Sequence, residues 1–283
     1  WLICMLPELW MRALEMPAFS VTTPYTLRIN LARLLRTASP AEAAIIAGLR
    51  SDLPASAFLS AYQIAMRAVD PSLPPEQWAC LCVSEKRLRS LSEMETYIEG
   101  GAVSGRKSHA MLAMDGIDWL YVIARSSSGL ICQRVSSKAE GVSPHPAKPG
   151  QPVIPELPHH VVDFTASPVD AAYRVDDAHQ RINKPFRYHE DVMTLLAFAG
   201  WVIRVAEVNT YLQRLVECMQ VLAGGYCANA AGYDKPQLDA FDALLKELMQ
   251  VSIPEEFQQT WHRDRQLLLM GQKARDIIRS RLA

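Results

Sequence analysis

Two changes of sequence pattern, at Trp78 and after Pro185, constrain the fold of this chain more than any other feature. Between them, short runs of β-branched and aromatic residues alternate with Gly, Ser and Pro, which is typical of strands and turns. On both sides, apolar residues recur at the spacing of an amphipathic helix. Such segregated blocks favour an α+β fold over alternating βαβ units. We therefore expect an N-terminal helical region (1–77), a β-rich middle domain (78–183) and a C-terminal helical bundle (184–283).

The helical blocks contain recognisable starts and breaks. Ser39-Pro40-Ala41-Glu42 is a capping box with proline at the first helical position, which predicts a helix start. Gly224 and Gly225, followed by small residues, predict a turn between two helices. The other helices expected from apolar spacing cover residues 58–69, 189–222, 236–249 and 254–281. Their long apolar stripes predict association through the C-terminal helices, either as a homo-oligomer or as a heteromer with a related subunit.

The middle block contains five candidate strands. They cover residues 80–84, 96–98, 119–124, 130–135 and 160–164. The segment from Pro144 to Pro158 holds six prolines and shows neither a helical nor a strand period, so we expect an exposed loop or a spacer along the sheet. His159 and His160 follow it directly and are expected in a solvated loop.

Composition excludes several classes of partner. Twenty-nine Lys and Arg against 30 Asp and Glu give a net charge of -1, so no global field draws the chain to nucleic acid or to an anionic membrane. The apolar stretches are too short to cross a bilayer. Six scattered cysteines suit a reducing cytoplasm better than a disulfide framework. Cys80 and Cys82 are expected as buried strand residues rather than, with His109, as metal ligands. Because the chain begins at Trp1 rather than Met, we expect further residues before it.

Three short motifs in the middle block come in a distinctive order. They are Cys82-Val83-Ser84-Glu85, Gly105-Arg106-Lys107-Ser108 and the run from Asp118 to Arg125, which ends in Ala-Arg. This order resembles the middle domain of the acyl-CoA dehydrogenase superfamily, with its Val-Thr-Glu strand end, Gly-x-Lys strand and Ala-Arg strand end. Residues 57–68 look like the family's last N-terminal helix, and residues 197–206 are similar to the start of its first long C-terminal helix. The resemblance implies an α+β acyl-CoA dehydrogenase-like fold.

The resemblance also implies an activity. Members of the family are flavoproteins that use FAD to oxidise acyl-CoA or another acyl thioester; a carboxylate removes the proton next to the thioester carbonyl, and the flavin accepts hydride from the next carbon. Aligning Ala199-Gly200 with the family's helix places Glu190 at the catalytic carboxylate of one branch. The alternative is that Glu190 and Asp191 lie in the first turn after Pro185, where the helix dipole alone favours acidic residues. A second carboxylate at Asp191 would also raise one of the two pKa values.

The cofactor-binding positions that the resemblance implies are Val83, Ser84, His109 and Met111. Ser84 stands where the family's hydroxyl reaches the flavin, although a hydroxyl at a strand end also serves as a local backbone cap. His109 and Met111 replace the family's aromatic and hydroxyl residues, and a methionine cannot donate that hydrogen bond.

Other departures affect the cofactor. The loop 86–90 lacks the glycines that let a backbone approach a ligand. Its cations Lys86, Arg87 and Arg89 would hold phosphates or simply face solvent. Flavin binding by this chain alone is therefore one hypothesis. The alternative is a flavin-less member that serves as an acyl-binding or heteromeric assembly subunit.

Overall fold

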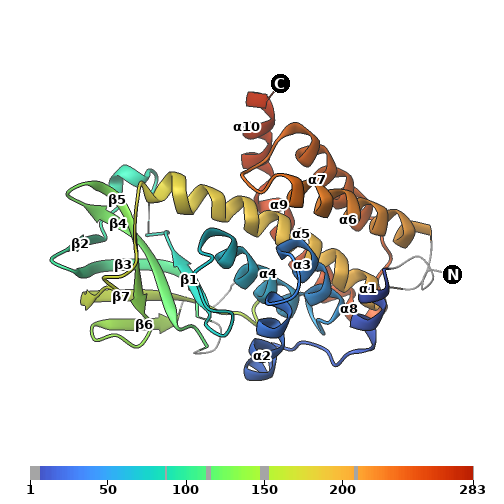
Figure 1. The fold of residues 1–283 in the computed structure, drawn as a ribbon, viewed down its shortest axis with the longest axis horizontal. Helices are drawn as coiled ribbons and strands as arrows, with labels where there is room; N and C mark the ends of the chain where they lie inside the picture. The colour runs from blue at the N-terminus through green and yellow to red at the C-terminus, as the bar shows by residue number, and fades with distance from the viewer. Residues whose placement is uncertain (1–6, 87, 113–115, 147–152, 207–209, 283) are drawn as a thin grey trace. The chain divides into compact units, whose positions relative to one another are not determined.

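Helices occupy both ends of the chain, and a β-sheet occupies its middle (Figure 1). This computed structural model describes residues 7–86, 88–112, 116–146, 153–206 and 210–282. The chain divides into a helical unit, Trp1–Ala68 with Tyr188–Ala283, and a β unit, Val69–Arg187. The predicted α+β class, with helices before and after a β-rich middle, is confirmed. None of the described helices is both long and apolar enough to span a membrane.

The helical unit joins N-terminal and C-terminal helices in one core. The N-terminal helices are α1 (Glu8–Glu15), α2 (Pro24–Leu35), α3 (Pro40–Leu49) and α4 (Pro54–Val69). The Ser39 hydroxyl accepts the backbone N–H of Glu42 at 3.4 Å, so the predicted cap at the start of α3 is confirmed. Helix α3 packs backbone to backbone against α5 (Lys184–Val205), because a Cβ added at Gly48 or Gly200 would overlap a carbonyl oxygen of the other helix.

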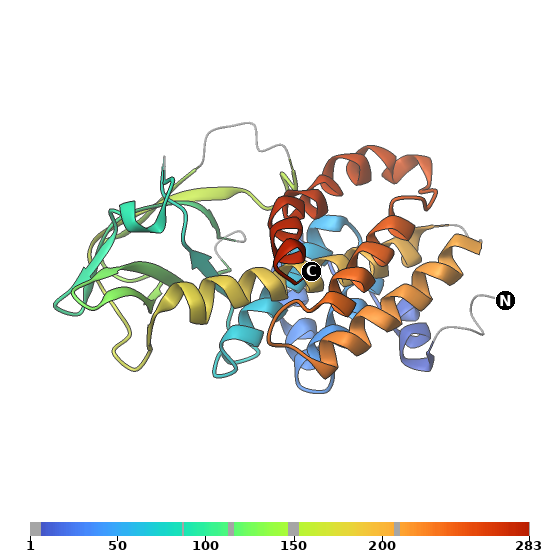
Figure 2. The same ribbon diagram turned by 90° about the horizontal axis from the view of Figure 1, so that it is seen from above.

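Three predicted helix boundaries in the C-terminal part are wrong. The pattern 189–222 covers two helices, α5 and α6 (Thr210–Ala228), and 254–281 covers α8 (Glu255–Asp264), α9 (Gln266–Met270) and α10 (Gln272–Leu282). Gly224 and Gly225 lie inside α6 rather than in a turn. Helix α7 (Lys235–Leu248) runs beside α6 (Figure 2). The Gln237 side chain of α7 donates to the Gly225 carbonyl at 3.0 Å, which ties the two helices together.

The sheet of the β unit is mixed. Its strands are β1 (Ala79–Cys82), β2 (Tyr97–Glu99), β3 (Ala102–Met111), β4 (Trp119–Ser126), β5 (Gly129–Ser136), β6 (Val142–Pro146), β7 (His159–Pro168) and β8 (Arg174–Asp176). Their order is β6-β7-β3-β2-β4-β5-β8, and β1 pairs with β4 in parallel. The core is formed by β4 and β5, whose Leu120, Val122 and Cys132 are fully buried. Two short turns of 3₁₀ and π type, Leu91–Glu93 and His179–Asn183, complete the described elements of this unit.

Four strands disagree with the sequence expectation. Strands β3 and β8 lie outside the five candidate strands, and β6 and β7 include residues expected in loops. Val142–Pro146 forms β6 although it overlaps the expected loop, because an edge strand tolerates prolines that donate no hydrogen bond. His159 and His160 are the first residues of β7 and not part of a solvated loop. Residues 147–152 of the proline-rich segment lie outside the described residues.

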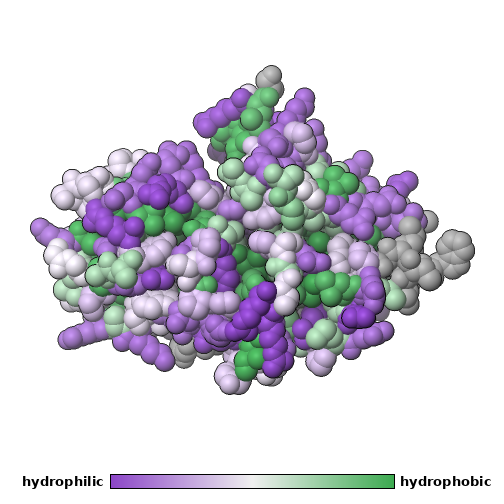
Figure 3. Space-filling view, viewed as in Figure 1, coloured by the Kyte–Doolittle hydropathy of each residue, from purple (hydrophilic) through white to green (hydrophobic). Residues whose placement is uncertain are grey.

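Several large apolar side chains of the last helices remain exposed. Figure 3 shows apolar surface on α10 near the C-terminus. The exposed residues of α9 and α10 are Leu269, Met270, Ile277 and Leu282. The predicted association through these helices stays a prediction.

Candidate functional site

A buried ion pair fixes the end of β1 to β3. Lys107 Nζ lies 2.8 Å from Glu85 Oε1 and donates to the Val83 carbonyl at 3.2 Å. Glu85 also accepts the backbone N–H groups of Glu95 and Thr96. Burial acts against the ionised carboxylate, but these hydrogen bonds outweigh it and hold the pKa of Glu85 below its ordinary value. Glu85 and Lys107 therefore set the path of the chain through Val83 and Ser84.

The two residues predicted at the strand end have different environments. Val83 is half-buried, whereas Ser84 is exposed. The Ser84 carbonyl accepts the N–H of Ser108 at 2.8 Å, which ties this strand end to β3. Its hydroxyl makes no hydrogen bond with the described residues, so it does not serve as the local backbone cap considered above.

His109 lies at a bulge in β3. The pairing of β3 with β7 shifts register between Lys107 and Ala110, and His109 has φ +58°, a left-handed conformation that is uncommon for a residue with a Cβ. Its side chain is exposed. Strained residues of this kind concentrate at ligand sites, where a bulge turns a side chain toward the ligand.

The structure adds one residue that the sequence did not indicate. His159 of β7 pairs in register with Met111, and its ring lies edge-on to the His109 ring with centroids 6.4 Å apart. Burial, followed by the neighbouring imidazoles of His109 and His160, lowers the pKa of His159. Met111 is buried and has a thioether where a donor was expected. The rings of His109 and His159 thus stand beside a residue that cannot donate a hydrogen bond.

Two buried polar atoms at the same bulge have no hydrogen-bond partner among the described residues. They are Ser108 Oγ on β3 and His160 Nδ1 on β7. An unpaired buried polar group costs about 1–3 kcal/mol, so proteins rarely retain one without a structural or functional reason. Together with His109 and His159, they mark this end of β3 as a polar site. We call it the bulge site.

Glu190 lies on α5 in the helical unit. Helix α5 begins at Lys184 and continues a preceding π turn, so Glu190 belongs to the second turn rather than the first. The helix dipole favours acidic residues mainly within the first turn. It therefore gives a weaker reason for a carboxylate at position 190 than it would if Glu190 lay in the first turn. The Glu190 side chain is half-buried.

Asp191 has its own cation. Arg275 Nη1 of α10 lies 2.7 Å from Asp191 Oδ2, and the Tyr233 hydroxyl donates to the same oxygen at 3.0 Å. Arg275 is only 1% exposed and also stacks on the Phe241 ring. The charge of Asp191 is therefore compensated, which removes the expected reason for repulsion between the carboxylates of Asp191 and Glu190.

The residue before Glu190 is also held from another helix. The Tyr226 hydroxyl of α6 lies 2.8 Å from His189 Nδ1, and both side chains are buried. Burial lowers the pKa of His189 to about 4, so the imidazole is neutral at pH 7 while it is hydrogen-bonded to the tyrosine hydroxyl. Anchors at positions 189 and 191 thus flank Glu190.

The remaining sequence candidates contribute little. Cys80 and Cys82 are buried on β1, as expected. Lys86 and Arg89 are exposed, and Arg87 lies outside the described residues. In the part of the chain that the structure describes, no group of three or more His, Cys, Asp or Glu side chains is arranged to hold a metal ion.

Comparison by sequence finds no relative: no protein-family profile and no curated protein matches the chain. Comparison by structure finds many. An FAD-dependent dehydrogenase has 14% identity and a TM-score of 0.58, over 83% of this chain and 78% of that one. FkbI, for biosynthesis of a methoxymalonyl extender unit, has 14% identity and a TM-score of 0.60, over 86% and 82%. XiaF from Streptomyces sp., in complex with FADH2 and glycerol, has 10% identity and a TM-score of 0.56, over 91% and 85%.

The likeness covers both units of the chain and identifies the fold. Its neighbours are flavoenzymes of acyl-CoA dehydrogenase type, so the fold implied by the three sequence motifs is confirmed. At such low identity the likeness concerns the fold alone, and function has to be argued from the residues.

Proposed function

We propose that this protein is a flavin-dependent oxidoreductase that acts on acyl-CoA or another acyl thioester. The observation that carries the proposal is the bulge site, where two buried polar atoms, Ser108 Oγ and His160 Nδ1, find no hydrogen-bond partner among the described residues. The site lies on a fold whose solved neighbours include complexes with FAD and FADH2. When bound, a flavin supplies the hydride acceptor that no amino acid side chain provides.

The groups at the bulge site, together with Val83, Ser84 and Met111 beside it, fit a flavin in part. The Ser84 hydroxyl is exposed and makes no hydrogen bond with the described residues, so it is available as a donor. The exposed His109 ring offers both an aromatic face and a ring nitrogen. Met111 offers only a soft apolar contact, and Val83 holds its place through the Lys107 hydrogen bond to its carbonyl. Ser84 and His109 would thus bind the flavin, with Met111 and Val83 packed beside it.

Glu190 is the proposed base. A carboxylate that removes a proton next to a thioester carbonyl must be held in one orientation and kept from excess solvent. Glu190 is half-buried, and the residues on either side of it are anchored, His189 to Tyr226 and Asp191 to Arg275. These anchors limit the freedom of the helical turn that carries Glu190.

A specific observation favours a second candidate, a flavin-less acyl-binding or heteromeric assembly subunit. Met111 removes a hydrogen bond at the flavin position, and the described residues of the loop after Glu85 include no glycine up to Ser90. The exposed apolar residues of α9 and α10 would suit a partner subunit.

The test of the proposed activity is the substitution Glu190→Gln. In the flavin-loaded protein, dye reduction by a panel of acyl thioesters should fall by about 10²–10⁴-fold, while flavin binding and the unfolding midpoint stay unchanged. The control is Glu217→Gln, which makes the same change to an exposed glutamate on α6 and should leave the rate unchanged. Equal rates in the wild type and Glu190→Gln would reject Glu190 as the base. A wild type that binds flavin but reduces no dye with any thioester would reject the substrate class.

A further inference from the structure

Helix α5 has one continuous face that begins at the proposed base. Side chains three or four positions apart on a helix lie on the same side of it. In chain order, this face of α5 contains Glu190, Thr194, Phe198 and Trp201. All four residues belong to the helical unit, and the two halves of the face differ in what they contact.

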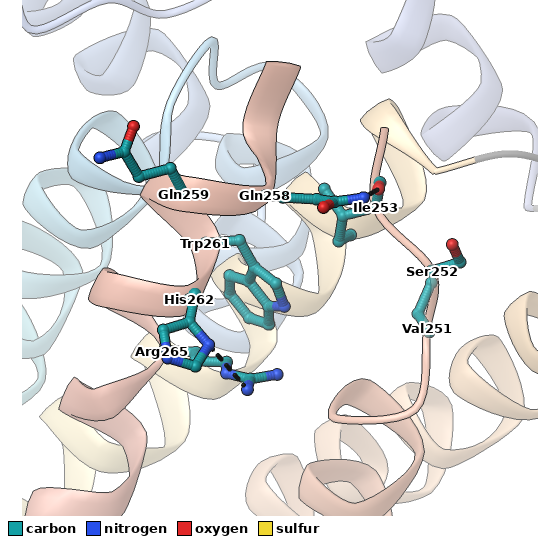
Figure 4. Close-up of a pocket in the computed structure, with 8 residues that line it drawn as sticks. All are labelled: Val251, Ser252, Ile253, Gln258, Gln259, Trp261, His262 and Arg265. Atoms are coloured by element: carbon teal, nitrogen blue, oxygen red, sulfur yellow. Dashed lines mark hydrogen bonds between the residues drawn. The ribbon is translucent and has the colours of Figure 1, made fainter. Parts of the chain in front are cut away.

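The second half of the face is filled by protein. Phe198 and Trp201 are fully buried, and their rings pack on Trp261 of α8 with centroids 5.9 and 5.6 Å away. The Trp261 ring lies between α8 and the connector that leads into it from α7 (Figure 4). The Trp201 indole nitrogen also donates to the Asp52 carbonyl at 3.2 Å. This aromatic cluster closes the face from Phe198 onward.

The first half of the face contains a buried hydroxyl without a partner. Thr194 is only 4% exposed, and its Oγ1 makes no hydrogen bond with the described residues. A threonine inside a helix often donates to the carbonyl four residues before it, here that of Glu190, but Thr194 does not. Its neighbours Met193 and Leu195 are apolar and fully buried. Valine would fill the same volume without an unpaired hydroxyl, so packing alone gives no reason for threonine here.

We propose that Thr194 is a specificity-determining residue, whose hydroxyl donates a hydrogen bond to an oxygen atom on the acyl chain of the substrate. The inference rests on the proposed function, because it takes the acyl chain to run along this face from Glu190. A helix rises about 1.5 Å per residue, so Thr194 lies about 6 Å further along the axis than Glu190. The thioester carbonyl adjoins the carbon that Glu190 deprotonates, so the oxygen that Thr194 contacts lies further along the chain.

The test compares acyl-CoA thioesters that differ by one atom. Methoxyacetyl-, 3-methoxypropionyl- and 4-methoxybutyryl-CoA are paired with butyryl-, pentanoyl- and hexanoyl-CoA, in which a methylene group replaces the ether oxygen. Calorimetry is performed on the full chain with FAD present and in the Glu190→Gln background, so that binding is measured without proton abstraction. In at least one pair, the ether should bind about 2- to 12-fold more tightly, as expected for one net hydrogen bond.

Three substitutions locate the source of this preference. Thr194→Val should abolish it, because valine cannot donate to the ether oxygen. Thr194→Ser keeps the hydroxyl and should preserve the preference. The matched control is Thr26→Val, which makes the same change to an exposed threonine of α2 and should leave both affinities unchanged.

A second measurement involves no ligand. Because the Thr194 hydroxyl has no partner, Thr194→Val should raise the thermal unfolding midpoint of the ligand-free protein. Thr194→Ser should lower the midpoint, since it keeps the hydroxyl and removes a buried methyl group. A lower midpoint in Thr194→Val would show that a protein group or a buried water already satisfies the hydroxyl, and it would overturn the proposal.

The binding results separate this proposal from the proposed activity. Equal binding within every pair, or a preference that persists in Thr194→Val, would overturn the role of Thr194 even if the wild type reduces dye. A protein that shows the preference but reduces no dye would contradict the activity and support the role of Thr194 in binding. Absence of binding by all six thioesters would contradict both.

Discussion

Lys107 Nζ and Glu85 Oε1 lie 2.8 Å apart with both side chains shielded from solvent, and this pair joins two of the motifs on which the sequence resemblance rests. Each of these two charges needs the other as its partner, because both are buried. A charge left alone in the interior costs several kcal/mol, so such a pair holds its two strands in one arrangement.

Lys107→Met should therefore lower the free energy of unfolding by about 3–5 kcal/mol, since it leaves the Glu85 carboxylate buried and unpaired. Urea unfolding followed by circular dichroism measures the change. The control is Arg106→Gln on the neighbouring residue, which breaks a largely exposed pair with Asp163 and should shift the midpoint little. A Lys107→Met midpoint equal to that of the wild type would show that the pair does not position the end of β1.

The pairing of Glu85 with Lys107 also shows what the sequence could and could not predict. Strand β4 is a run of aromatic and aliphatic residues, and β5 contains Leu130, Ile131, Cys132 and Val135, so both are predictable from local pattern. Strand β3 is not, because its central residues are polar and acquire partners only through the fold. Only the resemblance of Gly105-Arg106-Lys107-Ser108 to the family's Gly-x-Lys strand indicates that this segment forms a strand.

The same limit applies to the candidate sites. The order of the motifs predicts Ser84, and the alignment of Ala199-Gly200 predicts Glu190. The local pattern places His159 in a loop, because its pairing with Met111 joins residues far apart in the chain. Arg275 and Asp191 are separated by 84 positions, and no local pattern connects them. Periodicity identifies the buried face of a helix, but it does not identify the partner on another helix.

His189 should make stability depend on pH. Its pKa of about 4 in the folded protein lies below the ordinary value of about 6.5, so between these values the unfolded chain binds a proton that the folded chain does not. The free energy of unfolding should thus fall as the pH drops from about 6.5 toward 4. His189→Gln should flatten this part of the urea-midpoint profile, while His262→Gln, which changes an exposed imidazole, should not. A profile that is identical in His189→Gln and the wild type would contradict the buried, neutral state of His189.

Two glycines of the helical unit should respond in opposite ways to alanine. At Gly200 an added Cβ overlaps the Ile45 carbonyl, so Gly200→Ala should strongly destabilise the contact between α3 and α5. At Gly224 nothing lies within 4 Å, and α6 is continuous there, so Gly224→Ala should stabilise by about 0.5–1 kcal/mol. Thermal melts of both variants measure the two effects. Destabilisation by Gly224→Ala would indicate the turn that the sequence predicted and not the helix.

The central claim is that the bulge site of this chain binds a flavin, and a titration of the purified, flavin-free protein with FAD, followed by flavin fluorescence and visible absorbance, tests it most directly. We predict saturable binding of one FAD per chain. Ser84→Ala should weaken this binding by about 2- to 12-fold, as expected for one lost hydrogen bond, and Ser143→Ala, an exposed serine of β6, should leave it unchanged. A protein that remains colourless at saturating FAD, or an FAD affinity that is the same in Ser84→Ala and the wild type, would contradict the claim.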